Sequence, residues 1–241
     1  MKSQQLVKMA SGAIVTLGVV ALTGLLSNSP RAQAQDQRDD DEVSLVHIGF
    51  EIAPVPLNLE GKDRRLVGLG SYIVNAVADC NGCHSAGPAT EYSPGGNPYL
   101  LSPAFSGKQV VNPATYLAGG QDFGPFPGPP FPSIPHLYSR NLTPDKTGLP
   151  EGGHTFEQFR QIMRQGTDFD HVHPNCTAGP GTPPNCLEPP FNGDLLQVMP
   201  WPSFENMSEH HLRAIYEYLR AIPCNSGPVI DGAPYLQNVC N

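Results

Sequence analysis

Two cysteines and a histidine stand close together in the segment Cys80-Asn81-Gly82-Cys83-His84. Thiols separated by two residues lie on one side of a helical turn, and the imidazole of the next residue is carried beside them. This spacing is typical of c-type haem attachment, in which the thiols bond the vinyl groups and the imidazole ligates the iron. A redox-active cysteine pair would need a βαβ setting, and a zinc site would need a second close Cys/His pair. The sequence shows neither, so it predicts one covalent haem c held by Cys80, Cys83 and His84.

A methionine thioether is a candidate for the second axial position of that iron, where it would favour the reduced state. Leaving aside two near the N-terminus, the methionines of the chain are Met163, Met199 and Met207. Met163 falls within a helical pattern and Met207 directly precedes a helix cap, whereas Met199 lies on a loop stiffened by prolines. The residues alone favour Met199 and leave Met207, a histidine or a purely structural methionine as alternatives.

The first 34 residues have the pattern of a secretory signal peptide. Lys2 and Lys8 are positively charged, residues 12–26 are almost wholly apolar, and Ala32-Gln33-Ala34 is a small-residue cleavage site. The apolar stretch is shorter than the roughly 20 residues that a membrane span requires. We therefore expect cleavage after Ala34, a periplasmic location, and membrane association only through a partner or an uncleaved leader.

Composition and charge limit the possible partners. The chain has 241 residues with 27 prolines and 25 glycines, which favours one domain carrying long loops. Three of its 14 basic residues lie in the leader, so 11 remain against 22 acidic ones. This acidic balance argues against nucleic acid as a partner. It promotes solubility and would also steer encounter with a basic redox partner.

Four further cysteines, Cys176, Cys186, Cys224 and Cys240, form an even set in an exported chain, which indicates disulfides. Four cysteines allow three pairings. Pairing neighbours in the sequence closes short loops, which disulfides stabilise by roughly 2–4 kcal/mol. We therefore expect Cys176 to pair with Cys186, and Cys224 with Cys240, so that residues 224–241 form a disulfide-tethered tail.

Three helices are expected to position these groups. Apolar residues at helical spacing predict a helix over about 64–79 that leads into the CxxCH motif, although Gly70 inside it costs about 1 kcal/mol relative to Ala. A capping box beginning at Thr155 predicts a second helix that ends at Gly166. Ser208 predicts the start of a third helix, and Pro223 predicts its end.

Less regular segments surround the helices. Residues 35–63 are acidic and then interrupted by prolines, which predicts a solvated, extended N-terminal arm. Residues 85–153 are an insertion with little periodicity, within which residues 122–135 mix phenylalanines and prolines. That mixture favours a packed lid over the protein's own apolar surface, with a peptide-recognition segment as the alternative. His171 and His173 are expected to be polar surface, with a metal site as the alternative.

Residues 64–223 resemble the class I cytochromes c, particularly the large periplasmic mono-haem domains that are cytochrome subunits or partners of dehydrogenases. Besides the CxxCH motif, the matching segments are Gly70–Val74, Asn141–Asp145 with Thr147-Gly148, Phe156–Phe159, Met199-Pro200-Trp201 and Glu209–Leu219. The resemblance implies a mainly α, class I cytochrome c fold with long Pro/Gly-rich loop insertions. It also implies that the first and last helices cross beside the haem, with Gly70 accommodating Tyr216 or Tyr218.

The resemblance further implies a set of site residues and a function. Met199 corresponds to the distal iron ligand, Trp201 belongs to the same haem-binding segment, and Arg140, Asn141 and Thr143 are expected to hydrogen-bond the haem propionates. The implied function is transfer of single electrons between a redox donor and a redox acceptor, without a small-molecule substrate and without catalysis. The alternatives are a haem enzyme or gas sensor with an exchangeable sixth ligand, and the haem subunit of a membrane dehydrogenase or oxidase complex.

Overall fold

The computed structural model describes residues 30–100, 109–124, 136–177, 179–180 and 185–240. Most of the predicted leader and most of the predicted lid lie outside the described residues. The chain divides into two units, Met1–Val43 and Ser44–Asn241. The second unit contains the CxxCH motif and the main apolar core.

Helix α2, Pro30–Ile52, replaces the first part of the predicted extended arm, so that prediction is wrong up to residue 52. The reason is local, because the stretch is rich in residues that tolerate a helix and the prolines of the arm come only after Ile52. Within the second unit, the last turns of α2 approach α3 closely. A Cβ atom added to Gly49 would lie 1.9 Å from the carbonyl oxygen of Gly68, and the Ser71 hydroxyl donates to the Gly49 carbonyl at 2.6 Å.

Helix α3, Arg64–Tyr72, begins at Asp63, whose carboxylate accepts hydrogen bonds from the first-turn amides. It continues as a π-helical turn, η1, over Ile73–Val77. Asp79 then takes a left-handed conformation with φ 46°, and the short helix α4, Cys80–Cys83, follows. The predicted helix over 64–79 is thus confirmed as two consecutive segments that lead into the CxxCH motif.

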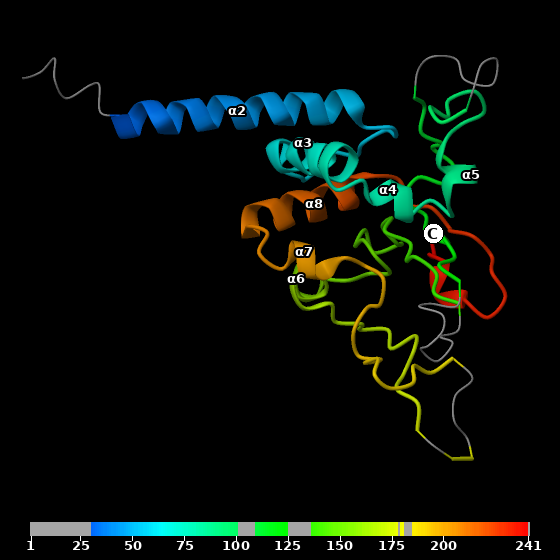
Figure 1. The fold of residues 1–241 in the computed structure, drawn as a ribbon. Helices are drawn as coiled ribbons and strands as arrows, with labels where there is room; N and C mark the ends of the chain where they lie inside the picture. The colour runs from blue at the N-terminus through cyan, green and yellow to red at the C-terminus, as the bar shows by residue number, and fades with distance from the viewer. Residues whose placement is uncertain (1–29, 101–108, 125–135, 178, 181–184, 241) are drawn as a thin grey trace, which may run out of the picture. The chain divides into compact units, whose positions relative to one another are not determined.

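Helix α8, Glu209–Ala221, crosses α3 at Gly70 (Figure 1). A Cβ atom added to Gly70 would lie 1.9 Å from the Ala214 carbonyl oxygen and 2.7 Å from the Tyr218 Cβ. The expected crossing is therefore present, and Tyr218 is the aromatic residue at the point of contact. Ser208 caps α8 by accepting from the His211 amide, as its sequence predicts.

Helix α6, Phe156–Gln165, has the predicted capping box at Thr155 and ends at Gly166 in a left-handed conformation with φ 69°. It packs against α8 and against the short helix α7, Trp201–Phe204. Its buried side consists of Phe159, Ile162 and Met163. Phe159 and Met163 join side chains of α3 and α8 in one apolar core.

The remaining described chain is mostly loop, with the short helices α5, Pro88–Glu91, and η2, Pro234–Leu236. Its only pairings between described strand-like residues are isolated bridges such as Asp122 with Tyr138. Both predicted disulfides are confirmed, Cys176–Cys186 and Cys224–Cys240. Among the described residues, no helix has the length and apolar character needed to cross a membrane.

Candidate haem-binding site

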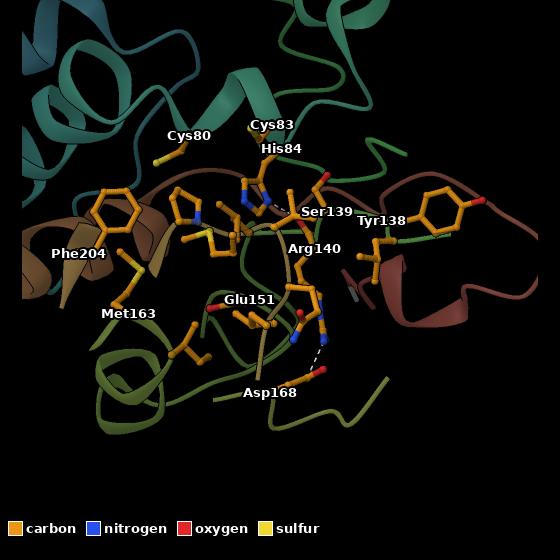
Figure 2. Close-up of a pocket in the computed structure, with 18 of the residues that line it drawn as sticks. Cys80, Cys83, His84, Tyr138, Ser139, Arg140, Glu151, Met163, Asp168 and Phe204 are labelled. Carbon is orange, nitrogen blue, oxygen red and sulfur yellow. Dashed lines mark hydrogen bonds and ion pairs between the residues drawn. The ribbon is translucent and has the colours of Figure 1, made fainter. Parts of the chain in front are cut away.

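A mostly apolar cavity lies beneath the CxxCH motif and encloses about 1310 Å³ of space not filled by atoms, including its open mouth (Figure 2). Apolar side chains from four parts of the chain form the wall: Val74 and Ala78, Phe159, Ile162 and Met163, Leu195, Leu196 and Met199, and Ile215 and Leu219.

His84 lies on this wall with only 9% of its surface exposed. Its Nδ1 is 2.7 Å from the carbonyl oxygen of Arg140. Because a carbonyl can only accept, Nδ1 carries the proton and Nε2 keeps a free lone pair, which is the arrangement of a metal-ligating histidine. Burial lowers the pKa of His84 and so favours the neutral form that ligation needs. This role of Arg140 is not predictable from the sequence, because a backbone atom leaves no signal in residue type.

Loop residues hold the Arg140 carbonyl in place. Gly119, with φ 75°, donates its amide to the His84 carbonyl at 2.8 Å. A Cβ atom on Gly119 would lie 2.6 Å from the Arg140 carbonyl carbon, so only glycine fits between the two residues. The backbone at His84 and the carbonyl that orients its ring are thus tied to one glycine of the insertion.

Cys80 and Cys83 line the same cavity and form no disulfide. The Asn81 side chain accepts from the Leu117 amide at 2.9 Å and so fixes the turn between the two thiols. Burial raises the pKa of Cys80 to about 12, and burial also raises the pKa of Cys83. Redox-active cysteines depend on a lowered thiol pKa, so these upward shifts argue against a thiol–disulfide redox pair.

Two methionines reach the cavity. Met199 is half-buried and follows Val198, a left-handed residue with φ 66°. Met163 reaches the wall from α6 and is 6% exposed, a position that its helical pattern in the sequence does not assign to the site. Met207, the sequence alternative for the sixth ligand, is partly buried against the core and is not among the described residues that line the cavity.

Trp201 and Asn141 are not among the described residues that line the cavity. They bond the backbone of the loops around it. The Trp201 indole donates to the Leu196 carbonyl at 3.2 Å, and its ring occupies the space that a Cβ on Gly166 would fill. It therefore fastens the Met199 loop to the end of α6.

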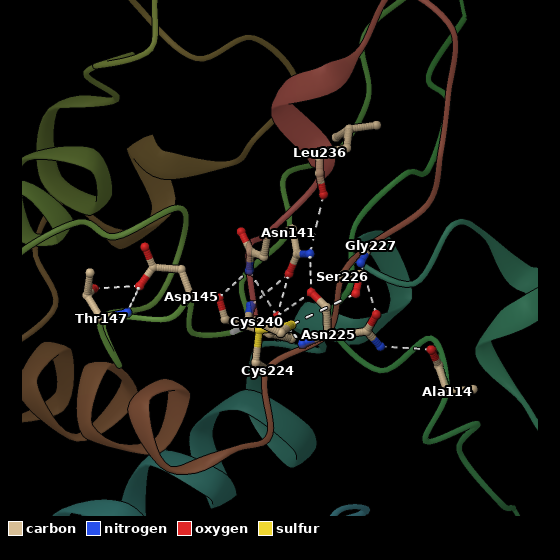
Figure 3. Close-up of a disulfide and its surroundings, with 12 residues drawn as sticks. Ala114, Asn141, Asp145, Thr147, Cys224, Asn225, Ser226, Gly227, Leu236 and Cys240 are labelled. Carbon is tan, nitrogen blue, oxygen red and sulfur yellow. Dashed lines mark hydrogen bonds between the residues drawn. A yellow bond between two sulfur atoms is a disulfide. The ribbon is translucent and has the colours of Figure 1, made fainter.

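The Asn141 side chain donates to the carbonyls of Asn225 and Leu236 and accepts from Thr143 (Figure 3). These bonds tie the loop after Arg140 to the tail that the Cys224–Cys240 disulfide closes. The side chain thereby stabilises the backbone that orients His84.

The Arg140 guanidinium lies at the cavity wall, with its side chain 15% exposed. It forms ion pairs with Asp168 at 2.7 Å and with Asp170. Arginine at such a site offers fixed positive charge for carboxylates.

The histidines of the cysteine-bearing loop bond other loop residues, and His173 also lines the cavity. His171 lies 3.6 Å from the Asp194 carboxylate, and His173 bonds the Asn185 carbonyl at 2.9 Å. In the described part of the chain, no cluster of three or more His, Cys, Asp or Glu side chains is arranged to hold a metal ion.

The paired thiols, the oriented histidine and the apolar cavity fit a haem group, and sequence similarity points to a cytochrome c-like protein. Over 157 residues, 65% of its length, the chain is 25% identical to the cytochrome c subunit of alcohol dehydrogenase (quinone) from Gluconacetobacter polyoxogenes. It has the same identity and coverage with the subunit of that name from Komagataeibacter europaeus. The match spans 22% of the length of these relatives. No protein-family model and no solved structure matches the chain.

Proposed function

We propose that this chain is a periplasmic mono-haem c-type cytochrome that carries single electrons between redox partners through an iron ligated by His84 and Met199. The observation that supports it best is the meeting of both thiols, the carbonyl-oriented imidazole and a loop methionine on the wall of one apolar cavity. A haem bound there would supply a one-electron ferrous–ferric couple.

Each residue has a defined part in this proposal. Cys80 and Cys83 provide the thioether links, and His84 offers Nε2 while Arg140 holds Nδ1. The apolar wall excludes water and thereby raises the cost of the extra charge on ferric iron, which favours the reduced state. Cys83 is exposed, so the attached edge of the group would lie within reach of a docking partner.

The relatives are subunits of a quinone-type alcohol dehydrogenase, which supports a dehydrogenase as the electron donor to this chain. The acidic charge of the chain would favour partners with a basic docking face. A donor of that kind would deliver one electron at a time, because the ferrous–ferric couple holds only one.

Covalent attachment is tested by mass spectrometry of the denatured protein purified from a host that attaches haem c. The expected mass is that of the processed chain plus one haem. Recovery of the haem by acidic solvent extraction, with Cys80 and Cys83 free to react with an alkylating reagent, would contradict the proposal.

Axial ligation is tested by comparing Met199→Ala with Met163→Leu, because both side chains line the cavity. Met199→Ala should remove the axial-sulfur spectroscopic signature, lower the potential and allow carbon monoxide to bind the reduced protein. Met163→Leu should preserve all three properties of the wild type, since it removes the other sulfur at similar volume. Loss of the signature only in Met163→Leu would move the ligand to α6, and ready binding of carbon monoxide by the wild type would favour a gas sensor or enzyme.

A further inference from the structure

Glu151 is one of three described acidic residues on the cavity wall, with Asp79 and Asp168, and the proposed electron transfer does not use it. It has a left-handed backbone with φ 52° and is followed by two glycines, which also have positive φ. The ring of His154 hydrogen-bonds the Glu151 carbonyl and closes this turn. A non-glycine residue in this conformation costs of order 1–3 kcal/mol, which the surrounding structure must offset. The turn places a half-buried carboxyl on the same cavity as His84 and Arg140 (Figure 2).

The charges around Glu151 are unbalanced. Asp168 and Asp170 both pair with the Arg140 guanidinium, whereas no hydrogen bond or ion pair reaches the Glu151 carboxylate from any described residue. An ionised Glu151 would thus be the third carboxylate near one guanidinium. Burial raises the pKa of Glu151, with Asp170 and Asp168 adding to the rise and His154 and Arg140 opposing it. The net direction is upward, so the protonated carboxyl is favoured more than in an exposed glutamate.

We infer that Glu151 is a redox-linked proton site, which binds a proton from solvent when the haem iron gains an electron and releases it when the iron is oxidised. The inference rests on the proposed function. The electron comes from the redox donor and goes to the acceptor, while one O–H bond forms at the carboxylate on reduction and breaks on oxidation. The physical reason is electrostatic, because ferric iron carries one more positive charge than ferrous iron and stabilises a carboxylate across a poorly solvated cavity.

Other titratable groups on the wall provide the competing explanations. Asp79 and His173 also line the cavity, and the carboxylates of a bound haem would add two more groups. An experiment must therefore remove the Glu151 carboxyl alone and leave these groups in place.

The test is potentiometric titration of the haem-loaded full chain between about pH 5 and about pH 8, a range above the ordinary glutamate pKa of about 4.3. The wild-type potential should fall with rising pH over part of this range, by at most about 59 mV per pH unit, which is the one-electron equivalent of a tenfold change. Glu151→Gln should give a pH-independent potential there. Glu60→Gln, at an exposed residue that does not line the cavity, should keep the wild-type slope.

A second variant, Glu151→Gly, guards against misfolding of Glu151→Gln, because glycine adopts positive φ without strain. Infrared difference spectra between reduced and oxidised protein should show a protonated-carboxyl band in the wild type and in Glu60→Gln, and none in either Glu151 variant. A flat wild-type profile, or a slope or carboxyl band that persists without Glu151, would overturn the inference.

The same measurements separate this inference from the proposed function. Absence of covalent haem, or of a reversible one-electron wave, would overturn both. A reversible wave that is independent of pH would overturn only the proton site and leave the electron carrier intact.

Discussion

The crossing of α3 and α8 gives the most direct link between one residue and the stability of the domain. A Cβ atom at Gly70 would lie 1.9 Å from the Ala214 carbonyl oxygen, 2.5 Å from its carbon and 2.7 Å from the Tyr218 Cβ. None of these atoms can rotate away, because they belong to the backbone or to the root of a side chain. Gly70→Ala must therefore push the two helices apart.

Two opposing effects determine how much stability Gly70→Ala loses. Alanine in place of glycine stabilises a helix by about 1 kcal/mol, whereas overpacking a core typically costs about 1–3 kcal/mol. Since the contacts at Gly70 are with rigid atoms, we expect a cost at or above the top of that range. The free energy of unfolding should then fall by roughly 2 kcal/mol, or roughly 4–8 °C in melting temperature for a domain of this size.

The assay is urea unfolding followed by far-ultraviolet circular dichroism, with Gly61→Ala as the control. Gly61 has a positive φ, of 66°, but an added Cβ there would meet no atom within 4 Å. The free energy of unfolding of Gly61→Ala should therefore fall only by the cost of the left-handed conformation, about 1 kcal/mol. If Gly70→Ala were as stable as the wild type, the gain in helix propensity would have prevailed, and the close approach of α3 and α8 would be refuted.

Three further outcomes are expected. Replacing Cys176 and Cys186 together by serine should lower the unfolding free energy by roughly 2–3 kcal/mol, the loop-entropy value for a short closed loop, and an unchanged urea midpoint would contradict it. Thr155→Ala should lower the free energy of unfolding by about 1 kcal/mol, because it removes the cap of α6. Thr155→Ser should retain most of that stability in the same unfolding assay. In chain produced without haem attachment, a thiol-alkylating reagent should modify exposed Cys83 well before Cys80, since burial raises the Cys80 pKa to about 12; equal labelling in peptide mass spectra would refute this order.

The helices that the sequence predicts well are those with local signals at their ends. The capping box at Thr155, the glycine that ends α6 and the serine that begins α8 act over a few residues, so their effects can be read from spacing alone. Helix α2 is not predicted, because the prolines of the arm argue against a helix although they act only after its end. Its contact with α3 depends on Gly49 meeting Gly68, a tertiary approach with no sequence period.

The candidate site also combines features that the sequence predicts with features that depend on the tertiary structure. The thiols and His84 lie within five residues of the sequence, so the motif alone predicts their chemistry. The place of Met163 is hidden, because periodicity identifies the buried face of α6 and does not reveal that part of this face borders a cavity. The bond from His84 to the Arg140 carbonyl is hidden for a different reason, because every residue type presents the same carbonyl.

The loops of the insertion do more than connect helices, because they orient the residue that would ligate the iron. Leu142 donates to the Leu117 carbonyl and Gly120 donates to the Ser139 carbonyl, so the segments around residues 117–120 and 139–142 are held together by backbone bonds. Gly119 lies between them and approaches Arg140 more closely than any side chain would permit. Since the His84 ring bonds a main-chain carbonyl, its tautomer depends on this backbone pairing and is independent of the Arg140 side chain. That independence leaves the guanidinium free to pair with Asp168 and Asp170, so Arg140 orients the His84 ring with its backbone and contributes charge to the cavity wall with its side chain.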